Sequence, residues 1–373
     1  MTQTSPLVAV VGSTGTGKSR LSIELASAVG RGLEESLGSW KASRIINADA
    51  MQAYKGLDLV TNKVTKSEMN GIEHTLFDFR KLDNEYVVTE WVMDAIAEHL
   101  LFANGLTSLE HPTHEPTAES PIPTSLTNLP PSLQQLFDNL PPRGDGVDEA
   151  TAFDLHSLLS HLDPATAARW HWKDTRKVLR SLNIIRESNK TVEDTYGSQL
   201  DPVARYPTLI FWLYMDSNHL NPMLDARIEK MVQLGLKDEI EVMRDAISGA
   251  ESRGQMTGLN QAIGYKEFGT YLSDTSRPQA EFDRGVAQMK TATRQYAVRQ
   301  VKWLKSRLLP EVVASDDVHI VLLNIKDVVS WETDILKPAV EHLKNFLNGR
   351  PLTEPDPGDI LSSFIEETRL STK

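Results

Sequence analysis

The sequence predicts an α/β fold in which helices flank a parallel β-sheet and a helical insertion domain interrupts the core. Strand-like and helix-like segments alternate over residues 6–104 and resume after residue 206, and amphipathic helical patterns lie between these two parts. With 373 residues and 40% hydrophobic content, the chain can form one large or two medium domains with a buried core.

The composition excludes several classes of protein. The chain has no cysteine, so disulfides, thiolate zinc sites and cysteine nucleophiles are excluded. No apolar run is long enough for a membrane helix, and the N-terminus lacks the basic start of a signal peptide. The formal net charge of −12 disfavours indiscriminate nucleic-acid binding but leaves room for local basic surfaces. We therefore expect a soluble intracellular protein with no membrane partner.

The first part of the core has the βαβ order of a parallel sheet. Strands are predicted at 7–11 and 44–48, and helices at 18–29 and near 87–101. Because such sheets bind ligands at the carboxyl ends of their strands, the loops that follow the two strands are the candidate site.

A glycine-rich loop with the spacing Gly-x-x-x-x-Gly-Lys-Ser joins the first strand to the first helix. Its backbone N–H groups can surround phosphate oxygens, and the following helix adds a favourable dipole for an anion. Lys18 would reach outer phosphate oxygens and Ser19 would ligate Mg²⁺. The fold class is therefore P-loop NTPase-like. The predicted diphosphate- or nucleotide-binding residues of this loop are Gly12, Ser13, Thr14, Gly15, Thr16, Gly17, Lys18 and Ser19.

The predicted insertion consists of a proline-rich stretch and a helical part. Residues 107–150 hold eight of the 19 prolines, which is typical of a flexible spacer. Helices are predicted after it at 153–162 and 173–185. The predicted organisation is a first part of the core at 1–104, an insertion at 105–205 with a helical part at 151–190, a second part of the core at 206–310 and a C-terminal tail at 311–373.

The second part of the core begins with an apolar strand at 207–215 that ends in Asp216. This Asp either holds magnesium or simply closes the strand. Helices are predicted after it at 220–236, 239–247 and 283–308.

Two of the predicted helices carry concentrated positive charge. Seven cations lie between residues 169 and 190, and seven more lie between 284 and 307, with few acids nearby. Either helix alone is equally typical of a solvated face, but the two together in an acidic chain predict a polyanionic partner, RNA or DNA.

Asp49 follows the second predicted strand and should face the phosphate loop across the edge of the sheet. A carboxylate at this place can act as a general base, ligate magnesium or cap a helix. The residues alone do not choose among these roles.

A series of ordered motifs extends from Asp49 to about residue 310. The series comprises Asp49-Ala-Met-Gln-Ala-Tyr-Lys-Gly-Leu-Asp-Leu-Val-Thr-Asn-Lys63, Gly71-Ile-Glu-His-Thr-Leu-Phe-Asp-Phe, the segment His156–Arg186, Asp225-Ala-Arg-Ile-Glu-Lys-Met, Asn260-Gln-Ala-Ile-Gly-Tyr-Lys-Glu and Thr293-Arg-Gln-Tyr-Ala-Val-Arg-Gln-Val-Lys-Trp. The chain thereby resembles the tRNA dimethylallyltransferases, also called tRNA isopentenyltransferases, of the eukaryotic type.

The resemblance implies transfer of a dimethylallyl group from dimethylallyl diphosphate to the exocyclic amine of the adenosine 3′ to the tRNA anticodon. It implies that Asp49 accepts the amine proton and that Arg227 binds the diphosphate, with Mg²⁺ as cofactor at Ser19. The implied partner is the tRNA anticodon stem-loop. The tRNA-binding residues implied by resemblance are Ala50, Met51, Gln52, Lys63, Arg176, Lys177, Arg180, Asn260, Gln261, Gly264, Tyr265 and Lys266.

The sequence departs from the family pattern in three places. Near residue 98 it lacks a block that carries a buried strand and a Gly-Gly-Thr turn, which removes part of the site. Ala50 replaces the usual serine, and the two-Cys, two-His zinc finger of eukaryotic relatives is missing. For the first departure, we favour a shortened splice or gene-model product that folds poorly over a sheet that closes differently.

Two other functions remain open from the sequence. A small-molecule P-loop kinase would explain the phosphate loop and Asp216 but leaves the basic helices unexplained. An adenylate isopentenyltransferase would explain the donor site but not the segment 156–186. The expected form is a monomer in the cytoplasm, with mitochondrial or nuclear pools.

Overall fold

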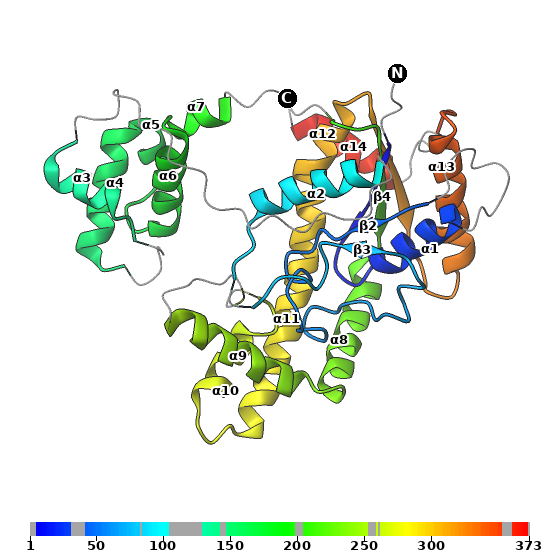
Figure 1. Cartoon of the computed structure of the whole chain (residues 1–373), viewed down its shortest axis with the longest axis horizontal. Coiled ribbons are helices and arrows are strands. Elements are labelled where there is room, and N and C mark those ends of the chain that lie inside the picture. Colours follow the sequence, from blue (N-terminus) through cyan, green and yellow to red (C-terminus); the bar gives the residue numbers. More distant parts are fainter. Residues whose placement is uncertain are drawn as a thin grey trace. The chain divides into compact units, whose positions relative to one another are not determined.

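The computed structural model describes residues 5–30, 42–82, 84–103, 129–141, 147–197, 204–252, 259, 262–352 and 360–371. The chain divides into two compact units (Figure 1). Unit 1 comprises residues 1–112 and 204–373, and unit 2 comprises residues 113–203. Unit 2 corresponds to most of the predicted insertion.

Unit 1 is built on a three-stranded parallel sheet in the order β1-β4-β5. The strands are β1 (Leu7–Gly12), β4 (Thr208–Tyr214) and β5 (Val318–Asn324). Leu7 is opposite Thr208 and Thr208 is opposite Val318, so the three strands start level. Since β4 lies in the middle and is covered on both faces, its residues 209–213 are all apolar and buried.

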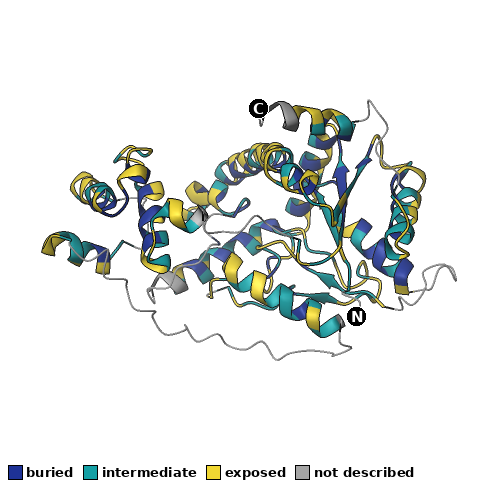
Figure 2. Ribbon diagram, turned by 90° about the horizontal axis from the view of Figure 1, so that it is seen from above, coloured by how far each residue is buried: buried dark blue, intermediate teal, exposed yellow. Residues whose placement is uncertain are grey.

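Helices cover both faces of this sheet, and the alternation of side chains along β4 separates two cores. Leu209, Phe211 and Leu213 face one core, whereas Trp212 faces the other. The first core is covered by α1 (Lys18–Gly30), the π-helix η6 (Glu332–Leu336) and α13 (Lys337–Leu347). The second is covered by the end of α11 (Gln279–Trp303), the π-helix η5 (Leu304–Leu308), α12 (Leu309–Val313) and α14 (Ile360–Ser371). Figure 2 shows the buried residues gathered in the strands and on the helix faces turned toward them.

The C-terminal part of the chain belongs to this core. Residues 311–373, predicted as a tail, supply the third strand of the sheet and helices on both of its faces. The apolar run Ile320–Leu323 is the signal that could have predicted the strand.

The second predicted strand does not join the sheet. β2 (Ile45–Ile46) pairs in parallel with β3 (His74–Thr75) to form a separate, two-residue ladder. Among the described residues, none pairs with the second edge of β1. The resemblance described above predicts that a strand is missing from the sequence near residue 98, and such a strand would pair at this edge.

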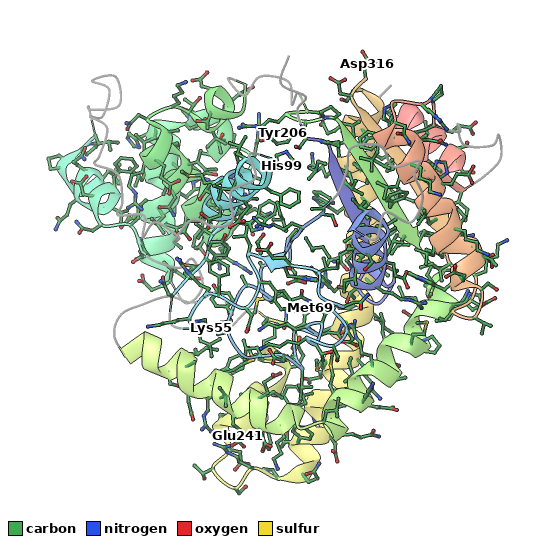
Figure 3. All side chains as sticks on the ribbon, turned by 45° about the vertical axis from the view of Figure 1, so that its right-hand side comes forward. Lys55, Met69, His99, Tyr206, Glu241 and Asp316 are labelled. Atoms are coloured by element: carbon green, nitrogen blue, oxygen red, sulfur yellow. The ribbon has the colours of Figure 1, made fainter. Side chains whose placement is uncertain are left out.

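Helix α2 (Val88–Ala103) connects the two ladders through side chains. His99 Nε2 donates to the carbonyl oxygen of Ser5 at 3.1 Å, just before β1, and the His99 ring lies 4.0 Å from that of Tyr206 (Figure 3). The neighbouring Glu98 forms an ion pair of 2.9 Å with Arg44, just before β2. Side-chain contacts of α2, and not backbone pairing, thus connect the sheet of β1 to the ladder of β2 and β3.

A second group of helices in unit 1 encloses its own core and anchors the segment after β2. Tyr54, Leu57 and Val60 of that segment pack into this core. The helices are α8 (Ser217–Gln233), α9 (Leu236–Ser252), the 3₁₀-helix η4 (Lys266–Phe268), α10 (Gly269–Ser273) and the first part of α11.

Unit 2 is helical and has a separate core that includes Leu155, Leu158, Leu182 and Ile185. Asp163 helps to close it, because its two carboxylate oxygens accept from the N–H groups of Thr166 and Val192. The helices are α3 (Pro131–Asp138), α4 (Glu149–Leu162), α5 (Pro164–Ala167), α6 (Thr175–Ser188) and α7 (Val192–Gly197). In the described part of the chain, every helix is too short or too polar to cross a membrane.

Candidate active site

The predicted phosphate loop is the turn between the end of β1 at Gly12 and the start of α1 at Lys18. A Cβ added at Gly12 would lie 2.5 Å from the carbonyl oxygen of Leu213, so the loop passes directly over β4. Gly17 has a φ of 86°, which favours glycine. Inside the loop, Thr16 Oγ1 donates to the carbonyl oxygen of Ser13 at 2.9 Å. The loop is therefore held in one shape before any ligand binds.

Lys18 lies over this loop, with Nζ donating to the carbonyl oxygen of Ser13 at 2.9 Å. Burial lowers the pKa of Lys18 to about 8; the charge of Asp49 opposes this shift, and the charge of Arg227 adds to it. These three side chains, which come from α1, the segment after β2, and α8, are therefore close enough to interact electrostatically.

Arg227 reaches the loop from α8. Its Nη2 donates to Thr14 Oγ1 at 3.1 Å, while its buried Nε has no hydrogen-bond partner among the described residues. Burial lowers the pKa of this guanidinium. A buried, incompletely paired guanidinium beside a glycine-rich loop is a suitable ligand for a phosphate group.

Asp49 is held by a turn that follows β2. Its Oδ1 accepts from the N–H groups of Met51 at 2.9 Å and Gln52 at 3.4 Å. Asn47 donates through Nδ2 to the carbonyl oxygens of Asp49 and Leu76, both at 2.9 Å. Asp49 thus caps a turn and not a helix, and the turn fixes the orientation of its carboxylate.

Helix α11 contributes two residues that the sequence analysis did not assign to the site. Gln300 Oε1 accepts from the N–H of Thr14 at 2.7 Å, and Tyr296 hydrogen-bonds to Gln300. Burial, followed by the charge of Asp49, raises the pKa of Tyr296. Both residues lie in the sequence motif that begins at Thr293, and this motif could have indicated that they belong to the site.

Two predicted tRNA-binding residues are used within the loop that carries Asp49. The Lys63 side chain is 3% exposed, and its Nζ bonds to Tyr54 O at 2.6 Å, to Gly56 O, and to the carboxylates of Asp58 and Asp78. With this full set of partners, Lys63 cross-links the loop and is not expected to contact RNA.

Gln52 is also bonded within the loop that carries Asp49. Its Nε2 donates to the carbonyl oxygens of Thr61 at 3.1 Å and Asn62 at 3.3 Å. Glu239 of α9 holds the same loop from outside, since its carboxylate accepts from the N–H groups of Leu59 and Val60. The loop that presents Asp49 is therefore tied both to itself and to the helices.

The predicted segment 260–266 is only partly described. Asn260 and Gln261 lie outside the described residues. A Cβ added at Gly264, which has a φ of 99°, would lie 2.2 Å from Val60 Cγ2. Gly264 thus allows this segment, with Tyr265 and Lys266 after it, to pack against the loop that carries Asp49.

Asp216 caps α8 by accepting from the N–H of Asn218 at 2.9 Å. This contact fits the strand-closing role of Asp216, and its magnesium role stays a prediction. Within the described ranges, no group of three or more His, Asp and Glu side chains could hold a metal ion.

Both basic segments contain cations that form ion pairs with acids. On α11 and η5, four of the seven cations form ion pairs with acids, and three of those acids come from other elements: Lys290 with Glu229, Arg294 with Asp225, and Lys305 with Glu367. The polyanion prediction, which counted only nearby acids in the sequence, therefore overstated the free charge of this helix.

The cations of the basic segment in unit 2 are exposed, and its ion pairs, such as that of Lys177 with Asp174, lie at the surface. Arg176, Lys177 and Arg180 of α6 are exposed, on the face opposite its buried apolar residues. Aromatic rings lie beside the cations, with Lys177 Nζ 4.7 Å from the centre of the Trp170 ring and Lys173 Nζ 4.9 Å from that of Trp172. Cations interleaved with aromatic rings suit single-stranded RNA.

Relatives of known identity match nearly the whole chain. The tRNA dimethylallyltransferase of Schizosaccharomyces pombe is 34% identical over 366 residues, which cover 92% of this chain and 79% of that protein. The human tRNA dimethylallyltransferase is 29% identical over 380 residues, covering 95% of this chain and 77% of that protein.

Solved structures share the fold. A crystal structure of a eukaryotic dimethylallyltransferase acting on tRNA has a TM-score of 0.72 and 26% identity, covering 97% of this chain and 85% of that chain. A tRNA isopentenylpyrophosphate transferase from Staphylococcus epidermidis has a TM-score of 0.51 and 23% identity, covering 93% of this chain and 99% of that chain, which is a likeness of fold. The predicted P-loop NTPase-like α/β fold is confirmed.

The model of the IPP transferase family matches residues 52–107 and 125–307, which is more than half of the chain. With the relatives above, this match confirms the resemblance seen in the ordered motifs. The chain belongs to the IPP transferase family.

Proposed function

We propose that this chain transfers a dimethylallyl group from dimethylallyl diphosphate to the exocyclic amine of the adenosine 3′ to a tRNA anticodon. The observation that carries this proposal is the convergence of Lys18, Arg227 and Asp49 at one site in unit 1. Two cations suit a diphosphate, and a carboxylate beside them suits proton acceptance. The relatives named as tRNA dimethylallyltransferases support the same reaction.

In the proposed step, the amine nitrogen attacks the first carbon of the dimethylallyl group. The bond between this carbon and the diphosphate oxygen breaks, and its electron pair leaves with the diphosphate. Lys18 and Arg227 neutralise the charge that develops on the leaving group, and Asp49 accepts the proton from the amine. The phosphate loop therefore holds a leaving group, while the dimethylallyl group is transferred.

We infer that Mg²⁺ binds together with the diphosphate. Ser19, in the first turn of α1, offers one hydroxyl oxygen, and the described residues form no carboxylate cluster that would bind a metal alone. This donor set fits Mg²⁺, which commonly keeps several waters and shares substrate phosphates. When bound, the ion would supply further neutralisation of the leaving diphosphate.

The proposed RNA surface has parts in both units. Ala50 and Met51 would contact the reacting nucleotide beside Asp49, whereas Gln52, like Lys63, is bonded within the loop. Tyr265 and Lys266 would extend this path. The exposed cations of unit 2 (Arg176, Lys177 and Arg180) would contact backbone phosphates. The adenine must leave its stack to reach Asp49, at a cost of a few kcal/mol that these contacts offset.

Transfer of a labelled dimethylallyl group from the diphosphate to an anticodon stem-loop tests the proposal. If the chain binds RNA but does not transfer the group, it is an RNA-binding protein. The block that is missing near residue 98 would then be required for transfer. Turnover of a nucleoside triphosphate without RNA would favour a kinase, and transfer to free adenosine nucleotide would favour the adenylate type.

We also propose that the chain is a monomer of the cytoplasm, with mitochondrial or nuclear pools. Light scattering of the purified chain and imaging of a tagged copy test these two points.

A further inference from the structure

Trp331 connects the C-terminal part of the chain to the phosphate loop. It lies directly before η6, beyond the residues that the family model matches, and is 4% exposed. We propose that Trp331 is a positioning residue that holds Gly17 and the first turns of α1 in the shape that binds the donor diphosphate. This inference rests on the function proposed above.

The indole ring lies against Gly17, the last glycine of the loop. A Cβ added at Gly17 would be 2.8 Å from Trp331 Cη2 and 3.0 Å from Cζ3, so the ring leaves room there for a hydrogen atom and for nothing larger. The ring therefore confines the backbone of Gly17 on one side.

The same ring is tied to α1 by two charged residues. Trp331 Nε1 donates to Glu24 Oε2 at 2.7 Å, and the Arg20 guanidinium lies 4.4 Å from the centre of the ring. Arg20 in turn pairs with Glu24 at 2.9 Å. Arg20 and Glu24 follow Lys18 within two turns of the helix, so the cluster fixes the helix that carries the phosphate-binding lysine.

Trp331 is itself held firmly. Asp327 accepts from the N–H of Ser330 at 2.7 Å and from its hydroxyl at 3.2 Å, which closes the turn before the indole. Ile335, one turn further on, is fully buried in the same core. A rigid support matters because small displacements of binding groups cost large factors in rate and affinity.

Binding of inorganic pyrophosphate to the full chain tests this role without requiring RNA or transfer. We expect Trp331→Leu to weaken pyrophosphate binding about tenfold and to leave anticodon stem-loop affinity unchanged. Ile335→Ala is the matched control, because it removes buried apolar contacts from the same core without touching Gly17. It should lower the thermal midpoint and leave pyrophosphate affinity unchanged.

If Trp331→Leu does not fold, Trp331→Phe and Glu24→Gln decide the question. Trp331→Phe keeps an aromatic ring but removes the N–H, so it should weaken pyrophosphate binding. Glu24→Gln keeps an acceptor for the indole N–H, so it should largely retain pyrophosphate binding. Equal affinity in the parent and the Trp331 variants, or equal loss in Ile335→Ala, overturns the inference and leaves the proposed function intact. A parent chain that binds no pyrophosphate overturns both.

Discussion

Thr14 joins three elements of the site through two hydrogen bonds. Its N–H is held by Gln300 of α11, and its hydroxyl accepts from Arg227 of α8. The phosphate loop is therefore oriented by helices that lie more than two hundred residues further along the chain. The chemistry of the site depends on side chains that these contacts bring within reach of Lys18.

The lowered pKa of Lys18 predicts a pH dependence of donor binding. Because its pKa is about 8 before the donor binds, the ammonium is lost as the pH rises through this value, and a bound diphosphate must recover the proton. Pyrophosphate affinity should therefore fall above about pH 8, with proton uptake detectable by calorimetry in buffers of different ionisation enthalpy. In Lys18→Arg, whose guanidinium stays charged, the profile should be flat; a flat profile in the parent would contradict this account.

Replacement of Asp49 by asparagine tests its role as the base. The amide oxygen can still accept from the N–H groups of Met51 and Gln52, so the turn should persist while proton acceptance is lost. We expect single-turnover transfer to fall by about 10²- to 10⁴-fold with pyrophosphate and RNA affinities retained. Asp58→Asn, in the same loop, serves as the control. Full turnover in Asp49→Asn would show that another group takes the proton.

Among the elements, α2 performs a connection that a strand would normally make. The ladders of β1 and β2 are separate, and Glu98 and His99 bind one to the other from the side. The Arg44 and Glu98 side chains are only 5% and 9% exposed, whereas the second partner of Arg44, Glu73, is 55% exposed. The buried ion pair of Arg44 with Glu98 should therefore contribute more to the stability of the fold than its exposed pair with Glu73.

Loss of the buried pair should destabilise unit 1. We expect Glu98→Ala to lower the free energy of unfolding by about 3 kcal/mol, because it leaves Arg44 buried with an incomplete set of partners. Glu73→Ala should cost less than about 1 kcal/mol, as expected for an exposed pair. Denaturant unfolding measures both, and equal effects would mean that α2 does not hold the two ladders together.

The loop 49–63 is an element whose stability rests on Lys63. Lys63→Met should lower the free energy of unfolding by about 1–3 kcal/mol, because the carboxylates and carbonyls around Nζ lose their donor. Lys55→Met, at an exposed position of the same loop, should have little effect. Once both variants are folded, their RNA affinities should equal that of the parent; a selective loss in Lys63→Met would restore this lysine to the RNA surface.

At the scale of the whole molecule, RNA binding should depend more on where the charges lie than on the net charge. The net charge is −12, so RNA binding should depend on local groups of exposed cations, among them Arg176, Lys177 and Arg180 of unit 2. Substituting Arg176, Lys177 and Arg180 by glutamine should reduce the slope of log affinity against log salt concentration by about 2 to 3. Lys290→Gln, which removes a paired cation whose side chain is only 22% exposed, should leave the slope unchanged. Fluorescence anisotropy with a stem-loop measures both, and equal slopes in the triple variant and the parent would contradict this assignment.

Local patterns in the sequence were sufficient for much of this molecule. The glycine spacing predicts the loop between β1 and α1, apolar periodicity predicts the core strand β4 and the helices α1, α2, α4, α6 and α8, and the ordered motifs predict the family. These features could be recognised because each depends on residues that are near one another along the chain.

The tertiary structure alone decided how distant segments complete the site. It makes the described residues after 311 part of the core, places Trp331 against Gly17 and brings Gln300 to Thr14. It also pairs cations of α11 and η5 with acids of α8 and α14, and it surrounds Lys63 with oxygen atoms. No spacing rule encodes these contacts, because they arise only when the chain packs its apolar faces together. The sequence by itself thus determined the chemistry available to the site, and packing decided which side chains are free to use it.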